Sequence, residues 1–213
     1  MICVLATIDD FWIFEMTSNE EKNSRSCGNA RDRLLKEAAR LFMEYGYERT
    51  TMRSIANATG IKLGSITYYF KSKEDILFAT MSAIIESGEE RALATQHACN
   101  DVKSKLKSLI EVELDSFLND TGAIFIKEWR CLQKERRTQL IQHQQVYENI
   151  WSKVLTDCHE RGIIRSSPEI ARRVLHGAFA WSESWNGMER ALDIPELAGE
   201  IMKLITAEVT PGG

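Results

Sequence analysis

The chain has 213 residues, of which 44% are hydrophobic and 27% are charged, and this is the composition of an ordinary globular protein. No apolar run approaches the roughly 18 residues that a membrane-spanning helix needs, so the sequence excludes such a helix. The five cysteines are odd in number and form no Cys-x-x-Cys pair, which favours reduced thiols in a cytoplasmic protein.

Positive charge is concentrated in one part of the chain. The net charge of the whole chain is -4, but residues 30–73 contain nine lysines and arginines against four acidic residues. This segment therefore has a net charge of +5, which leaves -9 for the rest of the chain. A basic module on an acidic body is typical of a protein that contacts nucleic-acid phosphates with one end only.

The N-terminal segment does not resemble a secretion signal. Residues 1–15 are apolar but contain Asp9 and Asp10, and they have neither a basic start nor a cleavage site. A polar stretch follows from Met16. We therefore expect a disordered N-terminal arm over residues 1–28, and we hypothesise that Met16 is the natural start and that residues 1–15 are an upstream-start artefact.

From residue 30 onward the apolar residues recur at helical spacing and the sequence predicts an all-α fold. Glycine and proline are sparse, and no long stretch alternates between polar and apolar residues. About nine helices are expected, the first beginning at Ala30, and their expected ends are near Tyr45, Ala58, Tyr69, Ala94, Leu118, Lys134, Arg161 and Trp185 and before Pro211.

Capping residues place the expected boundaries of these helices. Gly46, Gly60 and Gly162 are expected to end helices in the left-handed conformation, or to provide the turn after them. Thr51 is a good N-cap, and the segment from Ser72 to Asp75 resembles a capping box. Further starts are predicted near the polar residues Asn100, Ser167 and Asp193.

The segment from Thr51 to Phe70 has the pattern of a helix-turn-helix. Ile55 and Ile66 are placed to pack two short helices together around the turn at Gly60. The second short helix carries small and polar side chains and ends in aromatic residues. Such a helix fits the DNA major groove, with serine and threonine facing base edges and with tyrosine and lysine facing phosphates.

This stretch resembles the TetR family of one-component repressors. The resemblance covers residues 30–80, with Thr59 and Thr67 as departures from the usual alanine and tyrosine. The residues in register with the family pattern are Gly46, Thr50, Thr51, Met52, Ile55, Ala56, Gly60, Ile61, Gly64, Ile66, Tyr69, Phe70, Ser72, Lys73, Ile76 and Leu77.

The resemblance implies a three-helix DNA-binding domain over residues 29–74 and a helical ligand-binding and dimerisation domain over residues 75–213. Thr51 and Lys73 would hold phosphates, and Arg53 would reach a base or a phosphate. The residues that would face the groove are Lys62, Leu63, Gly64, Ser65, Thr67, Tyr68 and Tyr69. The alternative for the two tyrosines is that they are core residues.

In the C-terminal part, aromatic residues form stripes at helical spacing. They are typical either of a pocket for an apolar ligand with a few polar groups or of plain core packing. The candidate ligand-binding residues are Phe125, Trp129, Arg130, Leu132, Tyr147, Trp151, His176, Trp181 and Trp185.

The C-terminal part is also similar to regulators of fatty-acid, terpenoid or steroid breakdown that sense acyl-CoA thioesters. Arg130, Arg136 and Arg137 are candidates to bind the phosphates of such a ligand, and a solvated helix face is the alternative. The family resemblance further implies a homodimer through the last two helices and a pseudo-palindromic operator. An effector would tilt the fourth helix and so lower the affinity for DNA.

Other functions remain as alternatives to an effector-released repressor. A multidrug-sensing repressor belongs to the same class, whereas an architectural DNA binder would have a solid core and no effector. A small helical enzyme acting on acyl thioesters would need converging acid and base groups, and the sequence contains none of the motifs HExxH, GxSxG, GxGxxG or the P-loop. We therefore expect no catalytic residue, cofactor, metal site or membrane partner.

Overall fold

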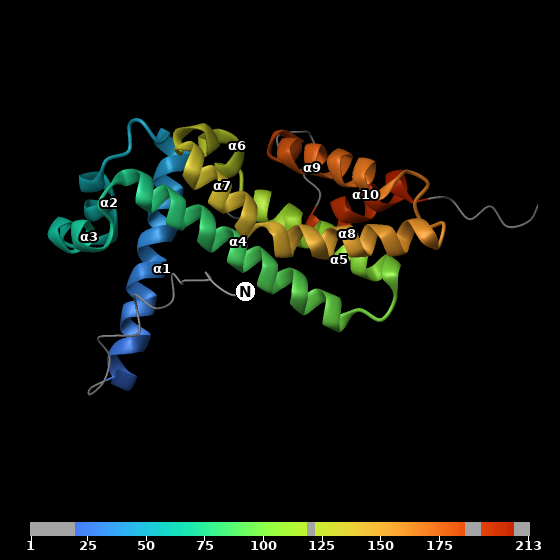
Figure 1. The fold of residues 1–213 in the computed structure, drawn as a ribbon, viewed down its shortest axis with the longest axis horizontal. Coiled ribbons are helices and arrows are strands. Elements are labelled where there is room, and N and C mark those ends of the chain that lie inside the picture. The colour runs from blue at the N-terminus through green and yellow to red at the C-terminus, as the bar shows by residue number, and fades with distance from the viewer. Residues whose placement is uncertain (1–19, 119–121, 186–192, 207–213) are drawn as a thin grey trace, which may run out of the picture.

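The computed structural model describes residues 20–118, 122–185 and 193–206, with side chains from residue 30 up to residue 182 and again from residue 193 (Figure 1). These residues form ten α-helices and a short 3-10 helix, and the prediction of an all-α fold is confirmed. The helices are α1 (Glu20–Tyr45), α2 (Met52–Thr59), α3 (Leu63–Tyr69), α4 (Lys73–Ala98), α5 (Val102–Leu118), α6 (Ile124–Glu128), η2 (Trp129–Cys131), α7 (Lys134–His143), α8 (Gln145–Glu160), α9 (Pro168–Trp185) and α10 (Ile194–Ile205).

Two predicted boundaries near the N-terminus and the centre of the chain are wrong. Helix α1 begins at Glu20 rather than Ala30: the strong helix formers Glu20, Glu21 and Lys22 begin it, whereas the apolar periodicity that predicted its start begins only at Leu34. Residues 20–28 of the predicted arm are therefore helical, and residues 1–19, with Met16, lie outside the described residues. Helix α5 is capped by Asp101 rather than Asn100, since the Asp101 carboxylate accepts from the Ser104 N–H at 2.9 Å.

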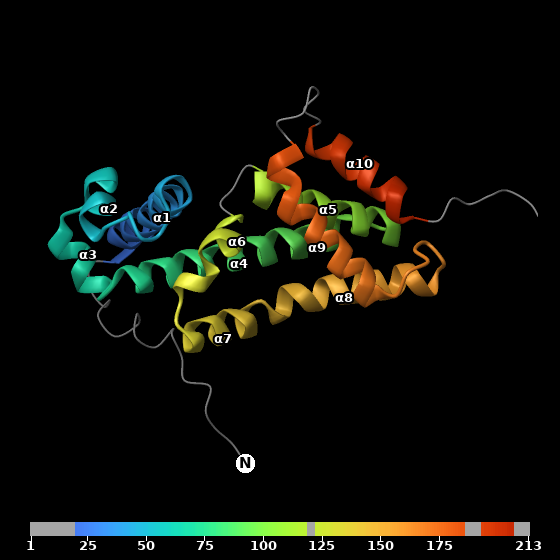
Figure 2. The ribbon, with the colours of Figure 1, turned by 90° about the horizontal axis from the view of Figure 1, so that it is seen from above.

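The helix expected up to Arg161 is divided into α7 and α8 at Gln144. The residues around this point are all polar, so nothing apolar holds one continuous helix on the core. The N–H of Gln144 still donates to the carbonyl of Leu140 at 2.9 Å, and the two helices follow each other without a loop (Figure 2). The preceding helix is also shorter than expected: α6 ends at Glu128 and η2 ends at Cys131.

Two hydrophobic clusters hold the helices together. The first joins α1, α2, α3 and the start of α4 to α6 and α7, and the second joins α5, α8, α9 and α10. Figures 1 and 2 show these groups at opposite ends of the molecule, with α4 extending through both. Ile76 and Leu77 of α4 belong to the first cluster and Ala92 belongs to the second. Helix α4 is therefore the connection between the two ends.

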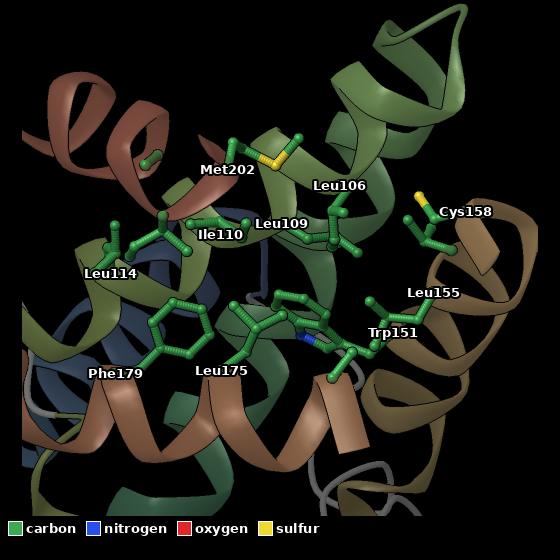
Figure 3. Packing of buried hydrophobic residues seen from close by; sticks show 14 of the residues in the cluster. Leu106, Leu109, Ile110, Leu114, Trp151, Leu155, Cys158, Leu175, Phe179 and Met202 are labelled. Atoms are coloured by element: carbon green, nitrogen blue, oxygen red, sulfur yellow. The ribbon is translucent and has the colours of Figure 1, made fainter. Parts of the chain in front are cut away.

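The second cluster contains the largest buried aromatic residues of the C-terminal part. Phe179 and Leu175 of α9 point toward α5, and Trp151 of α8 lies beside them (Figure 3). The ring centroids of Trp151 and Phe179 are 6.0 Å apart. Among the described helices, none combines the length and the apolar character needed to cross a bilayer.

Candidate functional site

The helix-turn-helix is positioned by hydrogen bonds that are local in the sequence. The hydroxyl of Thr51 accepts from the Ser54 N–H at 3.0 Å, and the hydroxyl of Ser54 accepts from the Thr51 N–H at 2.9 Å. Gly60 has a φ of 69°, in the region that favours glycine, and it ends α2. Ile55 and Ile66 are buried, which confirms the predicted packing between α2 and α3.

Thr59, the first departure from the family pattern, is accommodated inside this turn. Its side chain is buried, and its hydroxyl donates to the carbonyl of Ile55 at 2.9 Å. The same oxygen accepts from the Ile61 N–H at 3.3 Å. The additional polar group therefore has partners, and it joins the end of α2 to the start of the turn.

Helix α3 presents two tyrosines to solvent, so the alternative that they are core residues is wrong. Tyr68 is 68% exposed and Tyr69 is 54% exposed, and their rings meet edge to face at 5.1 Å. Lys62, Gly64, Ser65 and Thr67 are also exposed, while Leu63 is half-buried.

The hydroxyl of Thr67, the second departure, is already engaged within α3. It donates to the carbonyls of Leu63 and Gly64, each at 3.1 Å. Only its oxygen lone pairs and its methyl group are left for an external contact, whereas Ser65, two residues earlier on the helix, carries an exposed hydroxyl. Ser65 is therefore the better placed of the two to donate to an external acceptor.

The predicted cationic contacts lie on two sides of this helix. Arg53 and Lys62 border an open hollow of about 540 Å³ between α2 and α3. The ammonium group of Lys73 donates to the carbonyl of Tyr47 at 2.6 Å and lies 4.0 Å from the centre of the Tyr47 ring. Burial, together with the nearby acidic side chain of Glu74, raises the pKa of Tyr47 to about 12. Lys73 thus fixes the loop before α2 onto α4.

The candidate ligand-binding residues do not come together in one site. Leu132 is buried in the first cluster, and Phe125 and Trp129 pack against that cluster. Tyr147 and Trp151 belong instead to the second cluster. The reason is that α6 and α7 fold back onto α1 and α4, toward the end that carries the helix-turn-helix.

The arginines expected near a ligand phosphate have different surroundings. The guanidinium of Arg136 on α7 forms an ion pair with Asp75 on α4 and lies 4.5 Å from the Phe78 ring centre. The other oxygen of Asp75 accepts from the Ser72 N–H at 2.9 Å, which completes the predicted capping box. Arg136 therefore joins α7 to the start of α4, whereas Arg130 is exposed and Arg137 is half-buried.

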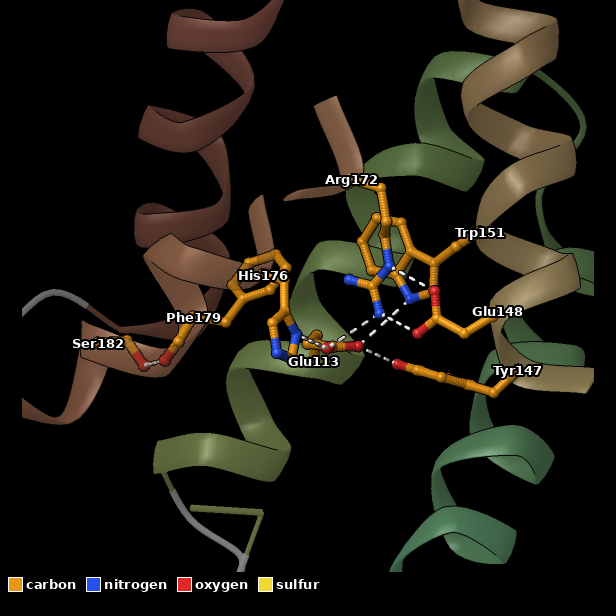
Figure 4. A network of polar contacts seen from close by, with 8 residues as sticks. All are labelled: Glu113, Tyr147, Glu148, Trp151, Arg172, His176, Phe179 and Ser182. Atoms are coloured by element: carbon orange, nitrogen blue, oxygen red, sulfur yellow. Dashed lines mark hydrogen bonds and ion pairs between the residues drawn. The ribbon is translucent and has the colours of Figure 1, made fainter. Parts of the chain in front are cut away.

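A buried polar network links α5, α8 and α9 beside the second cluster (Figure 4). The Glu113 carboxylate, 7% exposed, accepts from the Tyr147 hydroxyl and from the Trp151 indole N–H at 3.2 Å. The guanidinium of Arg172 lies 3.4 Å from Glu113 and 2.6 Å from Glu148, and it covers the Trp151 ring at 4.5 Å. Three helices that are distant in sequence therefore meet around one carboxylate.

The charges in this network stabilise each other. Burial alone would raise the pKa of Glu113, but the positive charge of Arg172, the neighbouring His176 side chain and the hydrogen bond from Tyr147 lower it below its ordinary value. Burial similarly opposes the charge of Arg172, and the two carboxylates outweigh it and raise the pKa of that guanidinium. Both groups are therefore ionised at neutral pH.

Glu113, Glu148 and Arg172 are not among the site residues that the sequence predicts. One signal was available for Glu113, because it occupies the same helical stripe as the apolar residues Ile110 and Phe117. A carboxylate at such a position needs buried partners. Those partners lie 34 to 59 residues away in the sequence, so a pattern within one helix does not reveal them.

The remaining candidates lie on α9. The His176 side chain is 58% exposed, and its Nδ1 atom is 3.8 Å from the Glu113 carboxylate. Trp181 is 70% exposed and faces away from the second cluster, on the same side of the helix as the exposed Ile170 and Val174. The side chain of Trp185 lies outside the described residues.

Comparisons with known proteins agree with this architecture. Residues 34–80 match the family described as bacterial regulatory proteins, tetR family, and residues 99–209 match the tetracyclin repressor-like C-terminal domain. The repressor KstR2 of Rhodococcus jostii is 24% identical over 89% of this chain and 96% of its own length. The fatty acid metabolism regulator protein of Bacillus subtilis is 24% identical over 83% of this chain and 93% of its own length.

Solved structures share the fold. The superantigen PfiT is 37% identical, with a TM-score of 0.73 over 84% of this chain and 97% of its own. AibR bound to isovaleryl coenzyme A and operator DNA is 21% identical, with a TM-score of 0.72 over 83% of this chain and 97% of its own. FadR from Bacillus subtilis bound to stearoyl-CoA is 24% identical, with a TM-score of 0.69 over 84% of this chain and 98% of its own.

Proposed function

Because the chain belongs to the TetR family of bacterial transcriptional regulators, we propose that it is a homodimeric repressor that an acyl-CoA releases from a pseudo-palindromic operator. The observation that carries this proposal is the exposed face of α3, on which two tyrosines project from a tightly packed helix-turn-helix. Residues 29–74 are the DNA-binding domain, and residues 75–213 bind the effector and form the dimer.

The exposed residues of α3 meet the major groove. Ser65 faces base edges, and Tyr68 and Tyr69 reach the DNA backbone or bases, with Lys62 at the N-terminus of the helix. Leu63, Gly64 and Thr67 make the close approach to the groove. Thr51 and Lys73 hold phosphates, and Arg53 contacts a base or a phosphate from the side of α2.

Helices α9 and α10 form the dimer interface. Ile170, Val174 and Trp181 make an apolar stripe along the outer side of α9, and Leu204 is exposed on α10. An exposed stripe of this kind is expected where a second copy of the chain covers it. A two-fold axis here would place the two α3 helices on successive half-sites of the operator.

The names of similar proteins support an acyl-CoA effector, since two of the structures hold acyl-CoA ligands and one curated relative regulates fatty acid metabolism. Arg130 and Arg137 are the candidate cations for the CoA phosphates, and Phe125, Trp129 and Leu132 lie on the same segment. The chain has no catalytic role in this proposal. It acts in the cytoplasm, where the bacterial chromosome lies.

Helix α4 transmits the effector signal. A Cβ atom at Gly88 of α4 would lie 3.9 Å from the Tyr147 ring, and Tyr147 donates to Glu113. At its other end, α4 begins next to the helix-turn-helix and is joined to α7 by Asp75 and Arg136. A ligand among α5, α7, α8 and α9 would therefore shift α4 and change the separation of the two α3 helices.

Footprinting on DNA from the regions flanking the gene tests this function, with isovaleryl-CoA and stearoyl-CoA as probes. We expect a protected site with two-fold symmetry that is lost when one of the acyl-CoAs is added. The double variant Tyr68→Ala/Tyr69→Ala should bind acyl-CoA but leave the DNA unprotected. An assay for free CoA thiol accompanies the experiment, and turnover of the acyl-CoA without any protected site would support an acyl thioester enzyme instead.

A further inference from the structure

One donor in the buried network has no partner. Two nitrogens of the Arg172 guanidinium, Nε and Nη2, donate to Glu148 at 3.0 and 2.6 Å, and Nη2 also lies 3.4 Å from Glu113. The third, Nη1, is buried and has no hydrogen-bond partner among the described residues. In Figure 4 it carries no dashed line and points away from both carboxylates. A buried donor without a partner is unfavourable, so an acceptor placed there is stabilised.

The charges around Arg172 limit the chemical nature of that acceptor. The guanidinium already forms ion pairs with the carboxylates of Glu113 and Glu148, and Glu113 also accepts hydrogen bonds from Tyr147 and Trp151. An anionic ligand group would be repelled by both carboxylates. A cationic group offers no acceptor to an N–H. A neutral oxygen, such as a carbonyl, is the acceptor that satisfies Nη1 without adding charge.

The surroundings of the network suit a carbonyl that is attached to a hydrocarbon. Trp151 lies under the guanidinium at 4.5 Å, with Phe179 beside it, and the ring of His176 is 6.4 Å from the ring of Phe117. His176 is more than half exposed, so the network adjoins solvent on that side and is buried on the other. A ligand could therefore enter past His176 and place its apolar part among the aromatic rings.

We propose that Nη1 of Arg172 donates to a neutral carbonyl oxygen of the effector, and that Glu113 and Glu148 orient the guanidinium for this contact. The inference rests on the proposed function and narrows the effector to a thioester or another neutral carbonyl compound. Free carboxylates are rejected because they would add a third negative charge to the site. Arg172 is thus the residue that distinguishes an acyl thioester from the corresponding free acid.

Calorimetric titration of the full chain tests this assignment. The probes are isovaleryl-CoA and stearoyl-CoA, each with its free acid and with a thioether analogue in which CH₂ replaces the carbonyl. We expect the thioester to bind about tenfold more tightly than the thioether, as the loss of one buried hydrogen bond predicts, and the free acid to bind no more tightly than the thioether.

Arg172→Lys keeps the positive charge for the two carboxylates but removes the planar third nitrogen, so it should bind thioester and thioether within about twofold of each other. Arg173→Lys, at the exposed neighbouring position, should keep the tenfold preference. If Arg172→Lys does not fold, as judged by circular dichroism, the charge-balanced double variant Glu113→Gln/Arg172→Met replaces it and should also lose the preference.

The outcomes separate the two proposals. Equal binding of thioester and thioether by the wild type overturns the role of Arg172 but leaves an acyl-CoA effector in place, and so does an unchanged preference in Arg172→Lys. If neither acyl-CoA binds the wild type, both the acyl-CoA effector and the carbonyl contact are overturned. Protection of an operator in the footprint would still stand as evidence for the regulator.

Discussion

The two hydrophobic clusters bury polar groups in different ways. At the DNA-binding end, the buried hydroxyls of Thr50 and Thr59 donate to backbone carbonyls at most nine residues away. In the body, Glu113 bonds to Tyr147, Trp151 and Arg172, which are 34 to 59 residues away. The buried hydroxyls of Thr50 and Thr59 are therefore satisfied within the nearby sequence, whereas the buried charge of Glu113 depends on the relative positions of three helices. That difference suits a rigid reader of DNA joined to a body that can rearrange.

The largest expected effect is on the free energy of unfolding when the buried Trp151 of the second cluster is truncated. Trp151 is fully buried, donates to Glu113 and lies against Arg172. Trp151→Ala should lower the free energy of unfolding by about 3–5 kcal/mol, as measured in urea. Ile141→Ala, on the exposed side of α7, should cost less than about 0.5 kcal/mol. Similar losses in the two variants would contradict the central position of Trp151.

The next effect concerns the face by which the body meets its partner. Trp181→Glu places a charge in the apolar stripe on α9 and should weaken dimerisation by at least about 2 kcal/mol, the cost typical of a central interface residue. Sedimentation equilibrium measures this change. Ile126→Glu, on the exposed side of α6, is the matched control and should remain dimeric. A dimer that is unchanged in Trp181→Glu would remove α9 from the interface.

Substitutions at the exposed residues of the helix-turn-helix should change DNA binding without changing the packing of α5, α8, α9 and α10. Lys62→Ala is expected to weaken operator binding by about 1–3 kcal/mol, and Ser65→Ala should relax the preference for the operator sequence. Changes at Thr67 should alter this preference less, because its hydroxyl donates within α3. Fluorescence anisotropy with operator and scrambled DNA provides the measurement. Lys103→Ala, on the exposed side of α5, should behave as the wild type.

The connection between the two ends is open to a more specific test. Arg136→Ala removes the ion pair between α7 and the start of α4 but leaves the Asp75 cap intact. We expect the response of operator affinity to the effector to shrink by about 0.5–2 kcal/mol, while operator affinity without effector changes little. Titrating operator binding with and without acyl-CoA measures the coupling. Lys134→Ala on the same helix is the control. If it reduces the response to the effector as much as Arg136→Ala does, the ion pair does not carry the coupling.

The smallest expected effect is on the salt dependence of DNA binding. Lys73→Ala should weaken binding to all sequences and reduce the slope of log Kobs against log salt by about 0.9, the value for one phosphate contact. Lys153→Ala, exposed on α8, should leave the slope unchanged. Because Lys73 also donates to the Tyr47 carbonyl, the thermal stability of the Lys73→Ala variant is measured in parallel. An unchanged slope with reduced stability would make Lys73 a structural residue only.

Local signals in the sequence were sufficient for the helix-turn-helix. Helices α2 and α3 end within a residue of the predicted positions, and Thr51 and Gly60 set the two ends of α2 through hydrogen bonds and backbone geometry inside the segment itself. The capping box from Ser72 to Asp75 is confirmed for the same reason. The amphipathic pattern also established the all-α fold, since each helix shows its buried side within a few turns.

The tertiary structure decided which buried sides meet. An apolar stripe indicates that a helix face is buried but not which helix covers it. Trp129 and Trp151 were therefore both predicted to bind the ligand, although they belong to different clusters. The pattern along one helix also does not reveal the partners of Glu113 and Arg172. Their buried charges are stable only because α5, α8 and α9 bring them into contact. The sequence alone determined the all-α fold and the helix-turn-helix, because those depend on neighbours along the chain. The network around Glu113 and Arg172 depends on contacts between helices that are distant in the sequence, and only the folded arrangement places them together.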